Sequence, residues 1–282
     1  MRKYNFNAMQ ARQECVDWIK TLSKSENFTR VVIGVSGGKD STIAAALCCE
    51  ALGAENVHGL LMPNGIQKDF DDSLRVCKAL GISYDTINIR PMYDAFLLQY
   101  ALCTLGTSNR HIKSRVYDCT LLDELVEKQP EKIEITEDAK INLAPRIRAV
   151  TLRLWGQSHH ARVCGTSNLS EITVGYYTKD GDNRCDFQVL SNFTTLEVVE
   201  IGKTYENIPI DLIEKVPADG LSELTDEEKL GVSYTDIHKY IRNLDMDNGT
   251  WRKINQMERN NLHKRNIPCF MASTSTLYTE EY

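Results

Sequence analysis

The sequence predicts a doubly wound, mainly parallel α/β sheet flanked by helices. A β-branched run at residues 31–35 is typical of a strand covered on both faces, and a glycine-bearing loop and a helix follow it directly. A second strand-helix unit and a third strand come next in the chain. Because right-handed crossovers join parallel strands, this β-α-β-α-β order predicts one Rossmann-like sheet, with a ligand at the carboxyl ends of its strands.

The elements of the first half follow from hydrophobic periodicity and from glycine. Helices are expected over residues 7–24, from the loop to residue 52, and over 69–80, where Gly81 ends the pattern. Strands are expected over residues 31–35, 57–62 and 83–89.

The regular pattern returns in the middle of the chain. A helix is expected over about 139–160, interrupted or begun at Pro145, with His159 and His160 as its end. A short strand is expected over 161–165.

Composition restricts the class of protein. The chain has 282 residues, of which 42% are hydrophobic and 26% charged, so it can bury one large core. We expect a single domain over residues 1–282, with its core at about 27–270 and a polar excursion at about 107–138. The net charge of -6 argues against a nucleic-acid-binding surface, which is normally basic.

The chain shows no membrane or secretion signal. It has no long apolar run, and its start lacks the apolar segment of a secretory signal. Its nine cysteines include no Cys-x-x-Cys pair, which disfavours both a disulfide framework and a zinc site. We therefore expect a cytoplasmic protein that contacts neither membrane nor nucleic acid and buries most of its cysteines.

The loop at residues 36–42 is the most informative motif. It reads Ser-Gly-Gly-Lys-Asp-Ser-Thr. Two glycines let the backbone turn tightly toward a ligand, and the helix that follows offers unpaired N–H donors and a partial positive charge. The pattern predicts an anion site, most simply for phosphate, although it has the spacing of neither common glycine-rich nucleotide loop.

This loop resembles the pyrophosphate loop of N-type ATP pyrophosphatases, which cleave ATP between its α- and β-phosphates and adenylate a substrate. The resemblance implies that the backbone and three hydroxyl groups hold the leaving pyrophosphate, and that Asp40 binds the Mg²⁺ that neutralises it. The implied ATP site comprises Gly34, Ser36, Gly37, Gly38, Lys39, Asp40, Ser41 and Thr42.

A second series of motifs begins at Gly165. The chain reads Gly-Thr-x-x-x-x-Glu and then Gly-Tyr-x-Thr-Lys-x-Gly-Asp-x-x-x-Asp, which ends at Asp186. Later motifs are Pro-x-x-Gly-Leu, Thr-Asp-Glu, Leu-Gly-x-Ser-Tyr-x-x-Ile and His-Lys-Arg-x-x-Pro, between Pro217 and Pro268. In this order and spacing the chain resembles the ammonia-dependent NAD synthetase family over about residues 30–270.

That resemblance implies a ligase that amidates nicotinic acid adenine dinucleotide (deamido-NAD) to NAD with ammonia. ATP converts the carboxylate into a mixed anhydride with AMP and releases pyrophosphate, after which ammonia attacks the activated carbonyl. Both steps build negative charge on oxygen atoms, so Mg²⁺ and fixed donors are expected to carry much of the catalysis.

The resemblance also implies roles for individual positions. Asp40 and Glu171 are expected to be catalytic and to bind Mg²⁺, and Thr166 to contact ATP. Deamido-NAD is expected to contact cations, which suit its two phosphates, and one acid, which suits ribose hydroxyls or the pyridinium ring. These substrate positions are Arg146, Lys179, Asp186, His263 and Lys264.

Three positions depart from the family pattern. Lys39 stands where the family usually has Gln, Thr195 stands where it has an ATP-binding lysine, and Ala218 replaces a Ser or Thr whose hydroxyl meets ATP. Lys39, Lys203 and Lys215 are the candidates to replace the missing cation.

Three hypotheses stay open at this point. The chain is an active synthetase, a divergent N-type ATP pyrophosphatase that adenylates another substrate, or a non-catalytic dinucleotide-binding homologue. A glutamine-using synthetase would need a further amidase domain, and none precedes Met1, so ammonia is expected to be free or delivered by a partner. Family members are homodimers that complete part of the dinucleotide site across the interface, so a homodimer is expected.

Overall fold

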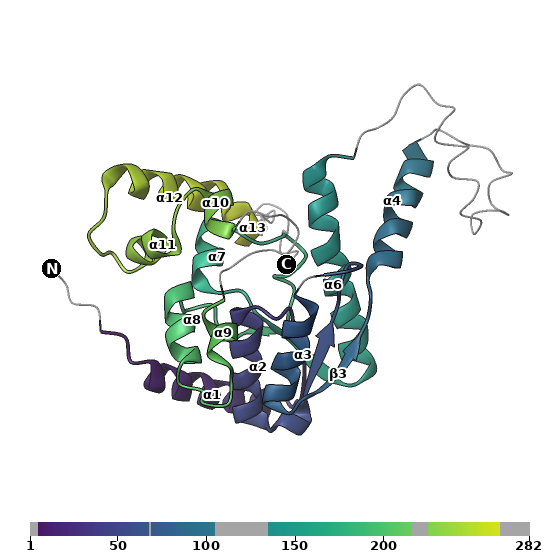
Figure 1. Cartoon of the computed structure of the whole chain (residues 1–282), viewed down its shortest axis with the longest axis horizontal. Helices are drawn as coiled ribbons and strands as arrows, with labels where there is room; N and C mark the ends of the chain where they lie inside the picture. Colours follow the sequence, from purple (N-terminus) through teal and green to yellow (C-terminus); the bar gives the residue numbers. More distant parts are fainter. Residues whose placement is uncertain (1–4, 68, 105–134, 216–224, 266–282) are drawn as a thin grey trace, which may run out of the picture.

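The computed structural model describes residues 5–67, 69–104, 135–215 and 225–265. Within these residues five strands form one parallel sheet in the order β3-β2-β1-β4-β5, and helices cover both of its faces (Figure 1). From the centre of the sheet, β1, β2 and β3 follow one another toward one edge, and β4 and β5 follow toward the other edge. The predicted doubly wound fold is confirmed, and its topological switch point lies between β1 and β4.

The strands are short, and β1 is central. Their bounds are β1 Arg30–Gly34, β2 Val57–Leu61, β3 Ser83–Thr86, β4 Ala161–Gly165 and β5 Phe187–Gln188. Val31 pairs with Val57 of β2, and Arg30 pairs with Ala161 of β4. The side chains of Val31, Val32 and Ile33 are fully buried, as expected for a strand covered on both faces.

The helices of the first half begin and end near the predicted residues. They are α1 Ala8–Ser25, α2 Lys39–Leu52, the short 3-10 helix η1 Ala54–Asn56, α3 Phe70–Leu80, α4 Arg90–Thr104 and α6 Glu137–Ser158. The Asn7 side chain caps α1 by accepting the N–H of Gln10. Gly81 ends α3 in the left-handed conformation that glycine adopts without strain.

The helices of the second half are shorter and rely on side-chain caps. They are α7 Leu169–Val174, α8 Thr195–Gly202, α9 Ile210–Ile213, α10 Asp226–Leu230, α11 Tyr234–Ile241, α12 Asn248–Asn260 and α13 Leu262–Arg265. Capping boxes, in which the capping side chain and a glutamate three residues later exchange hydrogen bonds with the backbone, begin α7, α8 and α10.

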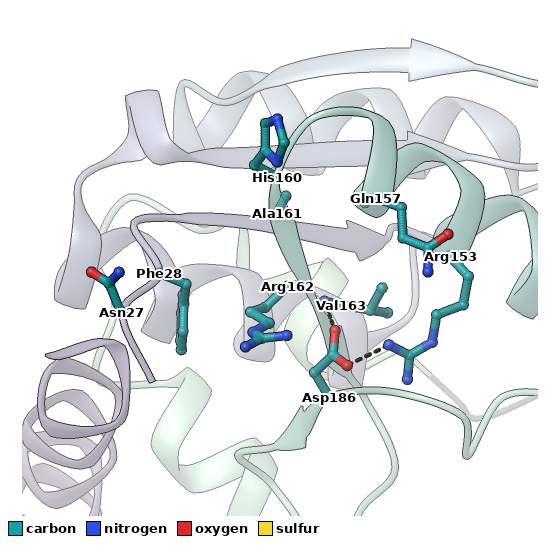
Figure 2. A pocket seen from close by; sticks show the side chains of 10 residues that line it. Asn27, Phe28, Arg153, Gln157, His160, Ala161, Arg162, Val163 and Asp186 are labelled. Atoms are coloured by element: carbon teal, nitrogen blue, oxygen red, sulfur yellow. Dashed lines mark hydrogen bonds and ion pairs between the residues drawn. The ribbon is translucent and has the colours of Figure 1, made fainter. Parts of the chain in front are cut away.

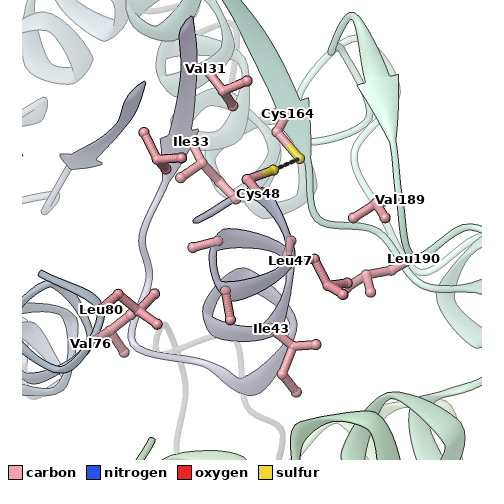
Figure 3. Close-up of a cluster of buried hydrophobic side chains, with 14 of the residues drawn as sticks. Val31, Ile33, Ile43, Leu47, Cys48, Val76, Leu80, Cys164, Val189 and Leu190 are labelled. Atoms are coloured by element: carbon pink, nitrogen blue, oxygen red, sulfur yellow. Dashed lines mark hydrogen bonds between the residues drawn. The ribbon is translucent and has the colours of Figure 1, made fainter. Parts of the chain in front are cut away.

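Two apolar cores lie on opposite faces of the sheet because alternate strand residues point to opposite sides. Val31 and Ile33 face α1, α2, α3, α8 and α9, where Ile43 and Leu47 of α2 fill the centre (Figure 3). Val32 faces the other core, which α4 and α6 cover. Helices α2 and α6 therefore stand on opposite faces of one sheet.

The described cysteines follow the prediction. Cys15, Cys48, Cys77 and Cys164 are buried and reduced, whereas two others are partly exposed. The Sγ atoms of Cys48 and Cys164 lie 3.8 Å apart in the larger core (Figure 3). These thiols pack as small apolar groups.

A third, smaller core joins the second-half helices. It contains Val174, Val232, Tyr234, Ile237 and Ile254, which come from α7, α11, α12 and the segment before α11. This core holds the α10–α13 group beside α7 (Figure 1).

Some boundaries differ from the predicted ones. The strand predicted over 83–89 ends at Thr86, and beyond it Ile87 and Ile89 pack into the core under α6 without continuing the strand. The helix predicted over 139–160 begins at Glu137 and continues through Pro145, so Pro145 neither starts nor interrupts it.

Of the excursion predicted at 107–138, residues 107–134 lie outside the described residues. Its last residues form the cap and first turn of α6. In the part of the chain that the structure describes, no helix is both long and apolar enough to cross a membrane.

Candidate active site

A cavity of about 380 Å³ lies at the carboxyl ends of β1, β2 and β4. One wall comes from the loop after β1 and from the first turns of α2 and α3, and the facing wall comes from Pro145, Arg148, Ala149 and Leu152 of α6. Because α2 and α6 cover opposite faces of the sheet, the cavity spans the sheet edge at the switch point, where ligands of this fold class bind.

Hydroxyl groups cross-link the loop after β1. Ser41 Oγ donates to the carbonyl of Gly38 at 3.0 Å and accepts the N–H of Ser36 at 3.2 Å, and the Ser36 and Ser41 hydroxyls lie 3.1 Å apart. Gly37 has φ +78°, and a Cβ there would lie 2.8 Å from the Cβ of Asp72. The loop is therefore rigid before any ligand arrives, and its tight turn requires glycine.

Most of the residues predicted to bind ATP, and both predicted Mg²⁺ ligands, converge on this cavity. Those that line it are Gly34, Ser36, Gly38, Lys39, Asp40, Ser41, Thr166 and Glu171. Gly37 and Thr42 do not line it. The Thr42 hydroxyl is fully buried and donates to the carbonyl of Gly38 at 2.8 Å, so it fastens the loop to α2.

Asn168 connects the two predicted catalytic acids. Its Nδ2 donates to Asp40 Oδ1 at 3.0 Å, and its backbone N–H donates to Glu171 Oε2 at 3.0 Å. Asn168 also caps α7, because its Oδ1 accepts the N–H of Glu171 at 3.1 Å. One fully buried residue thus fixes two carboxylates that lie 131 positions apart in the chain.

The electrostatics of this acid pair favour a cation. Burial raises the pKa of Glu171 well above its ordinary value, and the nearby Asp40 carboxylate raises it further. No described group of three or more His, Cys, Asp or Glu side chains could hold a metal by itself. Mg²⁺, however, is commonly held by one or two carboxylates together with substrate phosphates, and this donor set fits that mode.

Two of the three candidate replacement lysines reach the cavity. Lys39 Nζ lies 3.4 Å from Asp40 Oδ2, and only 5% of the residue is exposed. Lys215 pairs with two carboxylates of the α3 region, at 2.7 Å and 3.1 Å. Lys203 pairs with Glu200 and Glu214 and does not line the cavity.

The other two departures from the family pattern are Thr195 and Ala218. Thr195 is buried at the start of α8, where its hydroxyl donates to Asn168 Oδ1 at 3.2 Å, so it supports the amide that orients Asp40. Ala218 lies outside the described residues.

Three cavity-lining residues had no role in the sequence analysis. Asp182 accepts the N–H of Thr178 at 2.8 Å, and burial raises its pKa. Buried Asp226 accepts the hydroxyls of Tyr176 at 3.0 Å and Tyr234 at 3.2 Å. Both acids lie within the sequence motifs that resemble the family, so their positions in those motifs could have marked them as site residues.

Arg148 is the third cavity-lining residue without a predicted role. It lies on α6 and donates Nε–H to the carbonyl of Met62 at 3.0 Å. The sequence contains one indication of this placement. Arg148 stands two residues after Arg146, and helix residues at that spacing point to different sides of the helix.

The five residues predicted to bind deamido-NAD do not reach this cavity within one chain. Arg146 is exposed on α6, and its Nε–H donates to the carbonyl of Lys179 at 3.3 Å. The structure thus brings Arg146 and Lys179 together, but outside the cavity.

Asp186 faces a second pocket, of about 340 Å³, between β4, the end of α6 and the turn before β1 (Figure 2). Its Oδ2 accepts the N–H of Val163 at 2.7 Å, and its other oxygen pairs with Arg153. The carboxylate therefore joins β4 to α6.

The remaining two predicted substrate residues lie on α13. Lys264 Nζ donates to the carbonyls of Gly175 at 2.5 Å and Tyr177 at 2.9 Å, which ties α13 to the end of α7. His263 is exposed, and its Nδ1 lies 3.0 Å from the carbonyl oxygen of Asn260.

Comparison with known proteins identifies the family. The family model for NAD synthase matches residues 11–124 and 100–268. The NH(3)-dependent NAD(+) synthetase of Archaeoglobus fulgidus is 33% identical over 260 residues, which cover 89% of this chain and 92% of that protein.

Two solved structures share the fold. The NMN synthetase of Francisella tularensis has a TM-score of 0.78 at 28% identity, over 95% of this chain and 99% of that chain. The NH3-dependent NAD synthetase of Campylobacter jejuni has a TM-score of 0.69 at 28% identity, over 95% and 100%. The loop, the acid pair and these matches lead to one conclusion: this chain belongs to the NAD synthase family.

Proposed function

We propose that this chain catalyses the ATP-dependent amidation of deamido-NAD to NAD with ammonia. The substrate carboxylate attacks the α-phosphate of ATP, which forms an NAD-adenylate and releases pyrophosphate. Ammonia then attacks the activated carbonyl, so that the amide forms, a proton is released and AMP leaves. The observation that carries the proposal is the convergence of the loop after β1 with Asp40 and Glu171 in one cavity of a family member.

The chain's own groups would act mainly by positioning and by electrostatics. The loop of Ser36 and Ser41, with the N-terminus of α2, would bind the leaving pyrophosphate. Lys39 would add a cation on the same side. Because the loop is already cross-linked, little rearrangement would be needed when charge develops.

Asp40 and Glu171 would hold Mg²⁺, and Asn168 would keep both carboxylates in place. When bound, the ion supplies positive charge that offsets the charge on the pyrophosphate oxygens. Burial, followed by the repulsion from Asp40, raises the pKa of Glu171, and a bound cation would offset both effects.

A second candidate substrate is nicotinic acid mononucleotide, which would be amidated to NMN. The NMN synthetase of F. tularensis has the higher TM-score, 0.78 against 0.69, at the same 28% identity. In addition, none of the five residues expected to contact the dinucleotide lines the cavity of one chain. A mononucleotide would need fewer contacts outside that cavity.

We also propose that the enzyme is a homodimer. Val150 and Leu154 of α6 are 69% and 67% exposed and stand one helical turn apart. Arg146, on the same helix, would then reach the partner's cavity, which would account for its position outside its own.

The decisive experiment offers both acids. Protein is incubated with ATP, MgCl₂, ammonium and either deamido-NAD or nicotinic acid mononucleotide, and the products are identified by mass spectrometry. We expect NAD from deamido-NAD, with AMP and pyrophosphate in equal amounts. Preferential formation of NMN would replace the dinucleotide by the second candidate.

Two further results would reject both substrates. Binding of ATP and deamido-NAD by calorimetry, without any pyrophosphate release, would identify a non-catalytic homologue. Pyrophosphate release that depends on neither acid would point to another adenylated substrate.

A further inference from the structure

Arg148 is a half-buried cation on the cavity wall that no described side chain neutralises. Its Nε–H donates to the carbonyl of Met62, but among the described residues no carboxylate lies within ion-pair distance of its guanidinium. Burial lowers its pKa, and Asp182 opposes this effect only through space. A neutral carbonyl offsets the partial desolvation of this charge only in part, so the arrangement costs stability when no ligand is bound.

Two other partly buried arginines have carboxylate partners. Arg12 pairs with Glu50 at 2.7 Å, and Arg242 pairs with the buried Glu197 at 2.5 Å. Arg148 is as enclosed as these residues but lacks such a partner within the described ranges. Buried charges without a partner are typical of sites that receive a charged ligand.

The cavity supplies the space for such a ligand. Arg148 lies in the wall that α6 contributes, whereas the loop of Ser36 and Lys39 lies in the wall that α2 contributes. The two helices cover opposite faces of the sheet. The guanidinium therefore approaches a nucleotide from the side opposite to the pyrophosphate loop.

We infer that Arg148 binds the α-phosphate of ATP and the same phosphate in the acyl-adenylate, an inference that rests on the proposed function. During adenylation the carboxylate oxygen forms a bond to this phosphorus while the bond to the pyrophosphate oxygen breaks. Pyrophosphate then leaves with its electron pair, but the α-phosphate stays until ammonia displaces AMP. A guanidinium offers parallel N–H donors that match two phosphoryl oxygens through both steps.

The test compares Arg148→Met and Arg148→Lys with Arg12→Met as a matched control. Arg12 is also partly buried, but it is fully paired and lies outside the cavity. For each protein we would measure pyrophosphate release, the melting temperature, and the affinities for AMP and for inorganic pyrophosphate by calorimetry.

For Arg148→Met we expect kcat of pyrophosphate release to fall roughly 100-fold, as for loss of a donor to a transition-state oxyanion. AMP affinity should fall while pyrophosphate affinity stays unchanged. The melting temperature should stay the same or rise, because an uncompensated buried charge is removed. Arg148→Lys should recover part of the activity, and Arg12→Met should lose stability but keep kcat.

Several outcomes would overturn the inference. Unchanged AMP affinity in Arg148→Met, or an equal loss of pyrophosphate affinity, would exclude an α-phosphate role. A lower melting temperature with unchanged kcat would assign Arg148 a structural role. Failure of the wild-type protein to release pyrophosphate with either acid would reject the proposed function instead, and the AMP measurement would still test Arg148.

Discussion

Asp40 is the residue whose carboxylate the proposed reaction needs most. In Asp40→Asn the hydrogen bond from Asn168 Nδ2 can be kept by the new amide oxygen, but the charge that would hold Mg²⁺ is lost. We expect pyrophosphate release to fall roughly 100-fold or more, while the melting temperature changes little because relief of the repulsion with Glu171 opposes the loss of the Lys39 ion pair. Both quantities are measured on the same preparation.

The matched control is Asp17→Asn, an exposed acid on α1 that accepts a hydrogen bond from Gln13. It should keep wild-type activity. If Asp40→Asn turns over at the wild-type rate with MgCl₂ present, the metal assignment of Asp40 is wrong.

At this scale the sequence placed most of the residues expected to bind ATP at one cavity, whereas the residues expected to bind deamido-NAD lie outside the cavity of one chain. Residues 36–41 act through local backbone geometry, which glycine and hydroxyl side chains encode directly. Arg146 and Arg148 are both arginines of one motif. Only the rotation of α6 about its axis, relative to the sheet, decides that Arg148 faces the cavity. That rotation depends on how α6 packs against the sheet.

The end of α7 is the element where a glycine matters most. Gly175 has φ +70°, and a Cβ there would lie 2.2 Å from the Asn261 side chain, which donates to the carbonyl of Val174 at 2.9 Å. Gly175→Ala should lower the free energy of unfolding by roughly 3 kcal/mol, because it adds backbone strain and displaces that hydrogen bond. Denaturant unfolding measures the change.

Gly81→Ala is the control for this prediction. Gly81 ends α3 at φ +67°, but no atom lies within 4 Å of a Cβ built there. The variant should show only the backbone penalty of about 1 to 2 kcal/mol. Equal losses in the two variants would mean that the contact between α7 and α12 contributes nothing.

A stack of three rings links β2 to the end of α6 and should respond to pH. The His58 ring lies 4.2 Å from Trp155, which lies 3.9 Å from His159. Burial lowers the pKa of His58 below its ordinary value near 6.5, with further lowering from His159 and Arg30, while Asp85 opposes the shift. The folded state therefore binds fewer protons at this site than the unfolded state.

It follows that stability should rise with pH up to about 6.5, and that His58 should destabilise the fold as pH falls below that value. The free energy of unfolding, measured by urea titration at a series of pH values, should fall less steeply below pH 6.5 in His58→Gln than in wild type. His160→Gln, a change at an exposed ring outside the stack, is the control. Parallel profiles for wild type and His58→Gln would contradict the assignment.

Elements with strong local signals were predicted almost to the residue. The strand at 161–165 and the helix ended by Gly81 are examples. Helix α4 was missed, and Phe96 and Tyr100 on it are exposed, so it has no clean apolar stripe. Pro145 was misjudged because Thr136 caps two full turns before it and Gly181 packs against its ring, contacts that sequence alone does not reveal.

For the whole molecule, the proposed homodimer makes the sharpest prediction. Replacing both Val150 and Leu154 by Asp should convert a dimer to a monomer, because charges do not bury across an apolar interface. Light scattering after size exclusion measures the mass. The control is Met9→Asp, a change at a 60% exposed apolar residue on α1. A monomeric wild-type protein would refute this arrangement.

The sequence by itself determined the parallel α/β class, the order of the early strand-helix units and the tight glycine-bearing loop after β1. Each depends on neighbouring residues, whose periodicity and backbone preferences act over a few positions. Tertiary structure alone decided that Asp186 pairs with Arg153, that Lys264 ties two helices together, and that Arg148 points into the cavity. Those outcomes depend on how distant segments pack, because burial and charge pairing are set by the neighbours that folding brings within a few ångströms.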